Sequence, residues 1–416
     1  MTPEEKERID QIRHGIAPEG YIKSKDGVYP GDWTSKKIGQ WLQPMERPIS
    51  LEDEEKYELV TVRRGFGGVD SRGTYLGKNV LVKNYFGLCT GDFVISKRQI
   101  AHGACGVVPV ELDGAVVPNE YNVFVPQEGT NINMFNLMMQ LPHYKRLFYS
   151  MSDGVHIEKL LFKTDDWMRR SLAMPSLEEQ EKIAAILTMQ DKVIELKGKL
   201  LAEKQQQKKY LMQQLLTGKK RLPGFDSEWK KTKLKKLLME RKTYSPKGME
   251  YPHVTLSTEG IYAKGERYDR DHLVKSEEKG YKITHKGDIC YNPANLKFGV
   301  ICINNFGDAI FSPIYVTFEV IGNVSSEYLS NYLMRWDFIK AVRKYEEGTV
   351  FERMAVKPED FLKYEMLLPP YEEQVAIAEI LAVADKEIDL RRQELEQEKQ
   401  KKKALMQLLL TGIVRV

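Results

Sequence analysis

The chain has 416 residues, of which 42% are hydrophobic and 29% are charged, and its formal net charge is +4. Such a chain can form two or three domains with their own cores, and its composition excludes general disorder. It contains no apolar run typical of a signal peptide or a membrane span, so we expect a cytoplasmic protein with no membrane partner. A net charge this small does not by itself indicate a nucleic-acid partner.

Residues 1–31 are expected to form a short helix, capped at Thr2 and ending near Gly15, followed by a connection rich in glycine and proline. Short apolar runs separated by turns then predict a compact mixed domain over residues 32–174. Helices are expected near residues 131–139 and 142–149. Strands are expected at residues 57–62, 80–82, 92–96, 106–110 and 121–125.

Residues 175–221 are expected to form one long helix. Ser176 and Glu179 can make a capping box at its start, and Gly218 can end it in the left-handed conformation. Between Ser176 and Gly218 the only glycine is Gly198, and this stretch contains no proline. At about 1.5 Å per residue, the helix would be roughly 60 Å long.

The remainder of the chain repeats this layout. Residues 175–218 align without a gap on residues 369–412 at an offset of 194, with many identities. Residues 222–368 repeat the outline of the first domain, and residues 369–416 form the second long helix. The expected fold is therefore α+β, a tandem duplication of a mixed domain followed by a long helix.

Apolar residues keep to one stripe along both helices, and an isolated rod cannot bury such a stripe. The first helix is therefore expected to pack against its own repeat. The residues expected at this contact are Ile183, Leu187, Ile194, Leu201, Leu211 and Leu215 in the first helix, and Ile377, Leu381, Ile388, Leu395, Leu405 and Leu409 in the second.

The sequence offers little support for catalysis by this chain. Histidines are scattered without ligand spacing, and neither a Walker-type phosphate loop nor a complete methyltransferase motif is found. We expect no catalytic residue, no metal site and no cofactor in this chain. Buried thiols are expected at Cys89, Cys105, Cys290 and Cys302, rather than a metal site or disulfides.

Two loops have the same glycine frame and different contents. Residues 91–103 read GDFVISKRQIAHG, and residues 287–299 read GDICYNPANLKFG. Two homologous readers of different ligands would show this pattern, and so would ordinary loop drift.

The stretches MPSLEEQEKIAAIL with LLTGKKRLPGF, and LLPPYEEQVAIAEIL with LLTGIVRV, resemble the specificity subunits of bacterial and archaeal type I restriction-modification enzymes. The chain departs from the pattern at Ser176, where the second copy has the more usual Pro370. The resemblance implies that residues 32–174 and 222–368 are target recognition domains, each of which reads one half of a split sequence in double-stranded DNA. It also implies that the two helices form an antiparallel coiled coil, which spaces the domains and docks the methyltransferase subunits.

Two methyltransferase subunits are expected, joined by restriction and translocase subunits. The resemblance places S-adenosylmethionine, ATP and Mg in these partners. The polar runs at residues 204–209 and 399–403 are interpreted either as solvated segments or as a docking surface or a basic strip facing DNA. The alternative for the whole chain is a structural coiled-coil spacer with protein-binding end domains.

Candidate DNA contacts were chosen as cations for phosphates and as forked donors for base edges. Gly348 to Arg353 is a second candidate loop in the second domain. The candidates are Arg63, Arg64, Arg72, Lys78, Lys83, Lys97, Arg98 and Gln99 in the first domain, and Lys282, Lys286, Asn292, Asn295, Lys297, Thr349 and Arg353 in the second.

Overall fold

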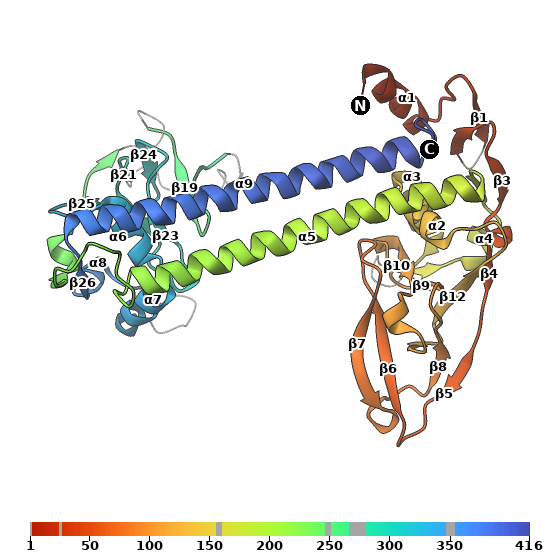
Figure 1. Ribbon diagram of the computed structural model, residues 1–416, viewed down its shortest axis with the longest axis horizontal. Helices are drawn as coiled ribbons and strands as arrows, with labels where there is room; N and C mark the ends of the chain where they lie inside the picture. The colour runs from red at the N-terminus through yellow and green to blue at the C-terminus, as the bar shows by residue number, and fades with distance from the viewer. Residues whose placement is uncertain (1, 25–26, 155–159, 246–250, 266–279, 347–353) are drawn as a thin grey trace. The chain divides into compact units, whose positions relative to one another are not determined.

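The computed structural model describes residues 2–416 except 25–26, 155–159, 246–250, 266–279 and 347–353 (Figure 1). The chain divides into two compact units, Met1–Lys197 with Glu394–Val416, and Gly198–Gln393. Both units contain helices and strands, so the expected mixed content is confirmed. The five segment boundaries proposed from the sequence stay predictions.

The first unit begins with α1 (Pro3–Arg13), which is capped by a reciprocal pair of hydrogen bonds between Thr2 and Glu5. The other short helices of this unit are α2 (Ile132–Met139), α3 (Pro142–Ser150) and α4 (Thr164–Met168). Its strands are β1 (Tyr21–Ser24), β2 (Gly27–Pro30), β3 (Thr34–Lys37), β4 (Leu42–Pro44), β5 (Pro48–Ser50), β6 (Lys56–Val62), β7 (Val69–Leu76), β8 (Asn84–Gly87), β9 (Phe93–Ser96), β10 (Cys105–Val107), β11 (Val116–Pro118), β12 (Tyr121–Pro126), β13 (Ser152–Asp153), β14 (Leu161–Phe162) and β15 (Ser171–Met174).

Two sheets organise the first unit. A four-stranded antiparallel sheet has the order β10-β9-β12-β4, and a five-stranded sheet has the order β5-β8-β11-β6-β7. β3 and β15 pair with each other, so the two ends of the domain leave side by side. Phe93, Phe124, Phe135 and Trp167 are fully buried between the four-stranded sheet and the helices, and their rings meet edge to face.

The second unit has a four-stranded sheet of order β23-β22-β25-β17, in which strands occupy the same places as in the first unit. Its short helices are α6 (Ser326–Leu333), α7 (Trp336–Val342) and α8 (Pro358–Phe361). Its strands are β16 (Lys230–Lys233), β17 (Leu238–Glu240), β18 (Tyr244–Ser245), β19 (Val254–Ser257), β20 (Gly260–Ala263), β21 (Tyr281–Thr284), β22 (Ile289–Tyr291), β23 (Ile301–Ile303), β24 (Ala309–Phe311), β25 (Val316–Val320) and β26 (Glu365–Leu368).

The two long helices are α5 (Leu177–Leu215) and α9 (Tyr371–Leu409), each of 39 residues. Gly218 and Gly412 follow them with φ of +69° and +71°, which confirms the left-handed ends. In each unit, ion pairs join α5 to α9 in antiparallel order. These pairs are Lys402–Asp191 and Lys197–Glu394 in the first unit, and Lys204–Glu387 and Lys208–Asp385 in the second. The polar runs therefore supply contacts between the helices.

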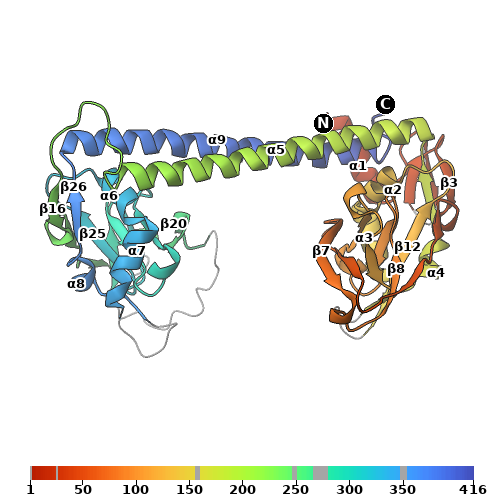
Figure 2. The same cartoon turned by 60° about the horizontal axis from the view of Figure 1, so that its bottom comes forward.

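The ends of both helices are parts of the two main cores. The first turns of α5 and the last turns of α9 lie in the core of the first unit, and α2 lies beside the start of α5 (Figures 1 and 2). The core of the second unit takes the other two ends. Of the predicted packing residues, Ile183, Leu187, Leu405 and Leu409 lie in the first core, and Leu211, Leu215, Ile377 and Leu381 lie in the second. Between these ends, Ile388 is buried, and Ile194, Leu201 and Leu395 are half-buried.

A Glu-Gln pair is repeated at the start of each long helix. The glutamate of each pair binds an arginine in the segment that follows the other long helix, which we call its exit. Glu179 accepts two hydrogen bonds from Arg415, at 2.6 and 2.7 Å. Glu373 accepts two from Arg221, at 2.7 and 2.8 Å, and a third from the Trp229 indole at 2.9 Å. We call these two contacts the exit clamps. They correct the expected capping box, because Ser176 does accept the Glu179 N–H but the Glu179 carboxylate binds Arg415.

The glutamine of each Glu-Gln pair forms hydrogen bonds with the backbone of the globular domain in its unit. The Gln180 side chain accepts the N–H of Asn131 and donates to the carbonyl oxygens of Gly129 and Pro175. Gln374 accepts the N–H of Ser325 and donates to Pro369. Each glutamine thus fixes the start of a long helix to the N-terminus of the short helix packed beside it.

Position 412 requires glycine for a steric reason as well as for its backbone conformation. A Cβ added to it would lie 2.3 Å from Pro30 Cγ, whereas a Cβ on Gly218 would lie 3.2 Å from the Trp229 ring. We expect Gly218→Ala to lower stability by about 1–2 kcal/mol through left-handed strain, and Gly412→Ala by about 1–3 kcal/mol more through overpacking. Thermal unfolding of the two variants measures this difference, and equal losses would contradict it.

Two local predictions are wrong. Residues 80–82 form no strand, because Leu81 and Val82 are exposed and have no apolar face to pack on. Cys89 is exposed, because it lies in the turn before β9 and not in a strand. None of the helices in the described part of the chain could span a membrane. The described residues also contain no group of three or more side chains suited to a metal ion.

Candidate nucleic-acid interface

The loop of residues 91–103 includes β9 and leads from it into β10 through a single 3-10 turn, Ile100–His102. Backbone hydrogen bonds link Gln99 to Ser96, His102 to Gln99, and Gly103 to Ile100. Gly103 has φ +74°, which returns the chain into β10. The segment is thus a tightly hydrogen-bonded turn at the end of β9, in which Arg98 is exposed, Lys97 and Gln99 are half-buried, and Ile100 is buried in the first core.

The loop of residues 287–299 repeats this backbone at an offset of 196. Asn295 donates to Asn292, Phe298 to Asn295, and Gly299 to Leu296, and Gly299 has φ +80°. The frame is fixed by an equivalent ion pair in each unit. Arg47 binds Asp92 through two hydrogen bonds, and Arg241 binds Asp288 in the same way. Both aspartates are buried, so the framing Gly-Asp pairs are structural.

Equivalent backbone positions carry different chemistry. Lys97 and Arg98 stand where the second loop has Pro293 and Ala294, and His102 stands where it has Phe298. At one further position both side chains are amides, Gln99 and Asn295. Base edges in the major groove are distinguished by forked donors and acceptors such as these. The two loops therefore present different sets of polar groups from the same frame.

The chain is similar to known proteins over most of its length. The family model described as "Type I restriction modification DNA specificity domain" matches residues 227–400. The putative type I restriction enzyme MjaX specificity subunit of Methanocaldococcus jannaschii is 28% identical, over 96% of this chain and 97% of that protein. The MjaVIII specificity subunit of the same organism is 22% identical, over 93% and 94%. Residues 227–400 match this family, and the chain is similar over nearly its whole length to type I specificity subunits.

Solved structures share the fold of this chain. A chain from a structure described as "Structural basis underlying complex assembly and conformational transition of the type I R-M system" has a TM-score of 0.57 and 17% identity, and covers 93% of this chain and 99% of its own. The type I system S subunit from M. genitalium has a TM-score of 0.55 and 12% identity, over 91% and 96%. A purely structural spacer is not favoured, because the family match and both curated relatives are specificity subunits.

The structure separates the candidate cations of the first unit into two groups. Arg63 and Arg64 lie at the turn end of the β6–β7 hairpin, while Lys78 and Lys83 lie at its other end. Arg72 is exposed within β7. Nearby carboxylates reduce the positive charge that these candidate cations give to the surface. Lys78 pairs with Glu54, Lys83 with Asp53, Arg98 with Glu120, and Arg63 with Asp70.

The candidates of the second unit differ in exposure. Lys286 and Asn295 are exposed, whereas Lys282 is buried and its ammonium donates to Glu240 at 2.8 Å. Asn292 is buried, and its side-chain oxygen accepts the N–H groups of Ala294 and Asn295, so it shapes the loop. Lys297 is buried with its ammonium 5.3 Å from the centre of the exposed Phe298 ring. Thr349 and Arg353 lie outside the described residues, and the DNA contacts stay predictions.

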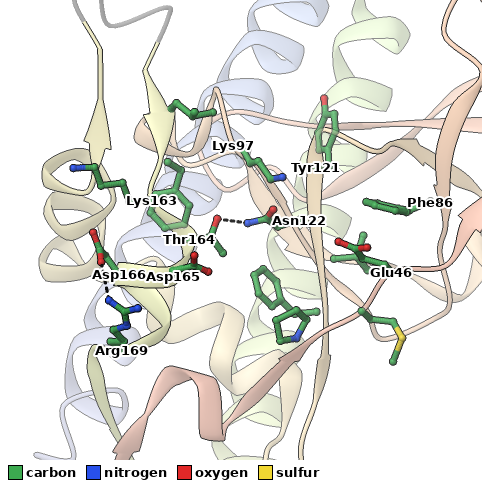
Figure 3. Close-up of a pocket in the computed structure, with 16 residues that line it drawn as sticks. Glu46, Phe86, Lys97, Tyr121, Asn122, Lys163, Thr164, Asp165, Asp166 and Arg169 are labelled. Carbon is green, nitrogen blue, oxygen red and sulfur yellow. Dashed lines mark hydrogen bonds and ion pairs between the residues drawn. The ribbon is translucent and has the colours of Figure 1, made fainter.

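A hollow of about 610 Å³ lies beside the first loop (Figure 3). Lys97 and Tyr121 line it, and Asn122 donates to Thr164 across it. The carboxylates and cations on its wall are mixed, and Asp166 already pairs with Arg169. This charge pattern favours neither an anion nor a cation, so we assign the hollow no separate role.

Sequence reasoning missed the turn of residues 63–68 as a neighbour of the first loop. Gly65 and Phe66 donate their N–H groups to the carbonyl oxygens of His102 and Gly103. The available signal was the Gly-Phe-Gly-Gly stretch at residues 65–68, which is typical of a tight turn.

Proposed function

We propose that each unit of this specificity subunit reads one half of a bipartite sequence in double-stranded DNA, through the loops 91–103 and 287–299 and their neighbours. The observation that carries this proposal is the same hydrogen-bonded backbone with different side chains at equivalent positions. A common frame keeps each loop in the same relation to its sheet, while the side chains determine which bases are bound. The chain would thus be a tandem duplication of a target recognition domain and a long helix.

We further propose that α5 and α9 form an antiparallel coiled coil that sets the gap between the half-sites and docks methyltransferase subunits. Exposed apolar residues at equivalent positions support docking. Met189 and Leu196 on α5 are 70% and 55% exposed, and Val383 and Leu390 on α9 are 66% and 60% exposed. Because each helix carries one such pair, two copies of the same partner would bind. Large apolar side chains left exposed along one helix face are typical of a contact surface.

In this proposal the chain itself is not catalytic. Methylation, translocation and cleavage would be carried out by methyltransferase and restriction subunits, which would bind S-adenosylmethionine, ATP and Mg in the cytoplasm. The proposed segments are residues 1–31, the recognition domains 32–174 and 222–368, and the helical regions 175–221 and 369–416.

Exchange of residues 33–174 for the equivalent domain of a relative tests the assignment. β3 and β15 pair with each other at the two ends of this segment, so the exchange replaces both partners together. Methylome sequencing of cells that carry the chimera and the cognate methyltransferase is expected to show one changed half of the target and one unchanged half. The reciprocal exchange of residues 229–368 is the matched control and should change only the other half. A change in both halves after either exchange would contradict independent reading.

A further inference from the structure

The turn between β6 and β7 contains a residue in an unfavourable backbone conformation. Phe66 has φ +60°, and it is the only residue other than glycine with positive φ in the described part of the chain. A bulky side chain in the left-handed region costs roughly 1–3 kcal/mol unless its surroundings hold it there. Contacts with surrounding residues must therefore stabilise this conformation, and they indicate the structural role of the turn.

The turn is closed by a hydrogen bond from the Arg63 N–H to the Gly68 carbonyl, and it contacts the first candidate loop and the strand after it. The N–H groups of Gly65 and Phe66 donate to the carbonyl oxygens of His102 and Gly103, at 2.7 and 2.8 Å. The Phe66 ring lies over Gly103, where an added Cβ would come within 2.9 Å of it, and packs against the first core. An added Cβ on Gly106 would lie 2.6 Å from the Cα of Gly68, so this second contact also requires glycine.

The second unit has no counterpart among its described residues. There, the hairpin of β19 and β20 turns directly between Ser257 and Gly260. Gly299 is the equivalent of Gly103, and a Cβ added to it would meet no described atom within 4 Å. The same loop frame is thus covered by a second turn in the first unit, whereas none of the described residues of the second unit covers it in this way.

We propose that the turn Arg63–Gly68 and the loop Lys97–Gly103 form one rigid DNA-reading element in the first unit, with Phe66 as its positioning residue. This inference rests on the proposed function. The turn carries the exposed Arg63 and Arg64, and the loop carries Lys97 and Arg98. Two hydrogen bonds and the ring on Gly103 fix the position of the arginines relative to the loop. Arginine forks suit guanine edges and phosphates, so their placement determines which sequence is bound.

The element predicts an effect confined to one half of the target. We expect Phe66→Gly, which removes the ring and relieves the backbone strain, to reduce discrimination at bases of the first half-site by about tenfold. Discrimination in the second half-site should not change. Gly103→Ala, which places a methyl group against the ring, should act in the same direction. Phe66→Leu keeps an apolar side chain and should retain more discrimination than Phe66→Gly.

The assay uses the full chain in complex with its methyltransferase subunits. Methylation rates are measured on a library of duplexes in which each base of the native target, found by methylome sequencing, is varied in turn. Gly114→Ala is the matched control, because Gly114 has φ +78° and no described atom lies within 4 Å of an added Cβ. Thermal unfolding and the rate on the native target report whether each variant is folded.

The element is supported if Phe66→Gly and Gly103→Ala lose discrimination between bases in the first half-site alone and Gly114→Ala does not. Unchanged discrimination in folded Phe66→Gly and Gly103→Ala would overturn it, and so would equal losses in both halves. If Phe66→Gly does not fold, the result for Gly103→Ala decides. The domain exchange described above tests the proposed function separately. If the exchange transfers the first half-site while folded Phe66 variants keep their discrimination, the element is rejected and half-site reading stays supported.

Discussion

Lengthening both long helices by four residues is expected to shift methylation to targets whose gap is about two base pairs longer. Four residues add about 6 Å to a helix, and two base pairs add about 7 Å to a duplex. Insertion after Gln207 in α5 and after Lys386 in α9 leaves Lys204–Glu387 on one side and Lys208–Asp385 on the other. The bases read in each half should stay the same. Methylome sequencing measures both the new gap and the loss of methylation at the old targets.

Insertion into α5 alone is the control. It would shift Lys204 by four residues relative to Glu387 or Lys208 relative to Asp385, so one side of the helix pair would lose its register. This variant should be less stable and less active, with no new defined target. An unchanged gap after the double insertion would show that bound methyltransferase subunits determine the spacing, and it would remove this role from the helices.

Arg221→Met is expected to destabilise the second unit by about 3 kcal/mol, because it leaves a fully buried carboxylate without its cation. Glu373 has no exposed surface, and Arg221 supplies two of the three hydrogen bonds that its carboxylate accepts. Removal of one partner of such a pair costs more than replacement of both. Urea unfolding combined with hydrogen exchange of the segment around Trp229 measures the local loss.

The other exit clamp provides the comparison. Arg415→Met removes the equivalent cation from Glu179, but the Arg415 side chain is 42% exposed, against 29% for Arg221. Water can therefore replace more of its interactions, and the loss should be smaller. The double change of Arg221→Met with Glu373→Gln should recover part of the stability, since no buried charge remains. Equal losses at the two clamps, or no recovery, would contradict this account of Glu373.

The sequence predicts the repeated helices well because their signals are local. Gly218 and Gly412 end the helices as expected, and the apolar stripes contain the residues that enter the two cores. The clamp between Glu179 and Arg415 could not be predicted in this way, because its partners are 236 residues apart. The motif at the helix start was visible, but a capping box explained it equally well until the position of the other helix was known.

Surface charge illustrates the same limit at the candidate site. The sequence makes Lys78 and Lys83 candidates for phosphate contact, but Glu54 and Asp53 face them from the turn before β6. Asn292 was chosen as a base reader for its amide, and the structure places that amide in the loop's own hydrogen bonds. Both cases depend on which groups meet in space, and residue type and spacing do not specify this.

The composition of the first core has a consequence for synthesis of the chain. Leu409 and Leu410 complete a core that begins at Trp33, so this core stays open on one side until α9 has been made. At roughly 5–20 residues per second on the ribosome, the delay would be tens of seconds. The second unit is one continuous segment, Gly198–Gln393, and can close as soon as it emerges. The domain that is translated first would therefore finish folding last, and its apolar face would need protection by chaperones in the interval.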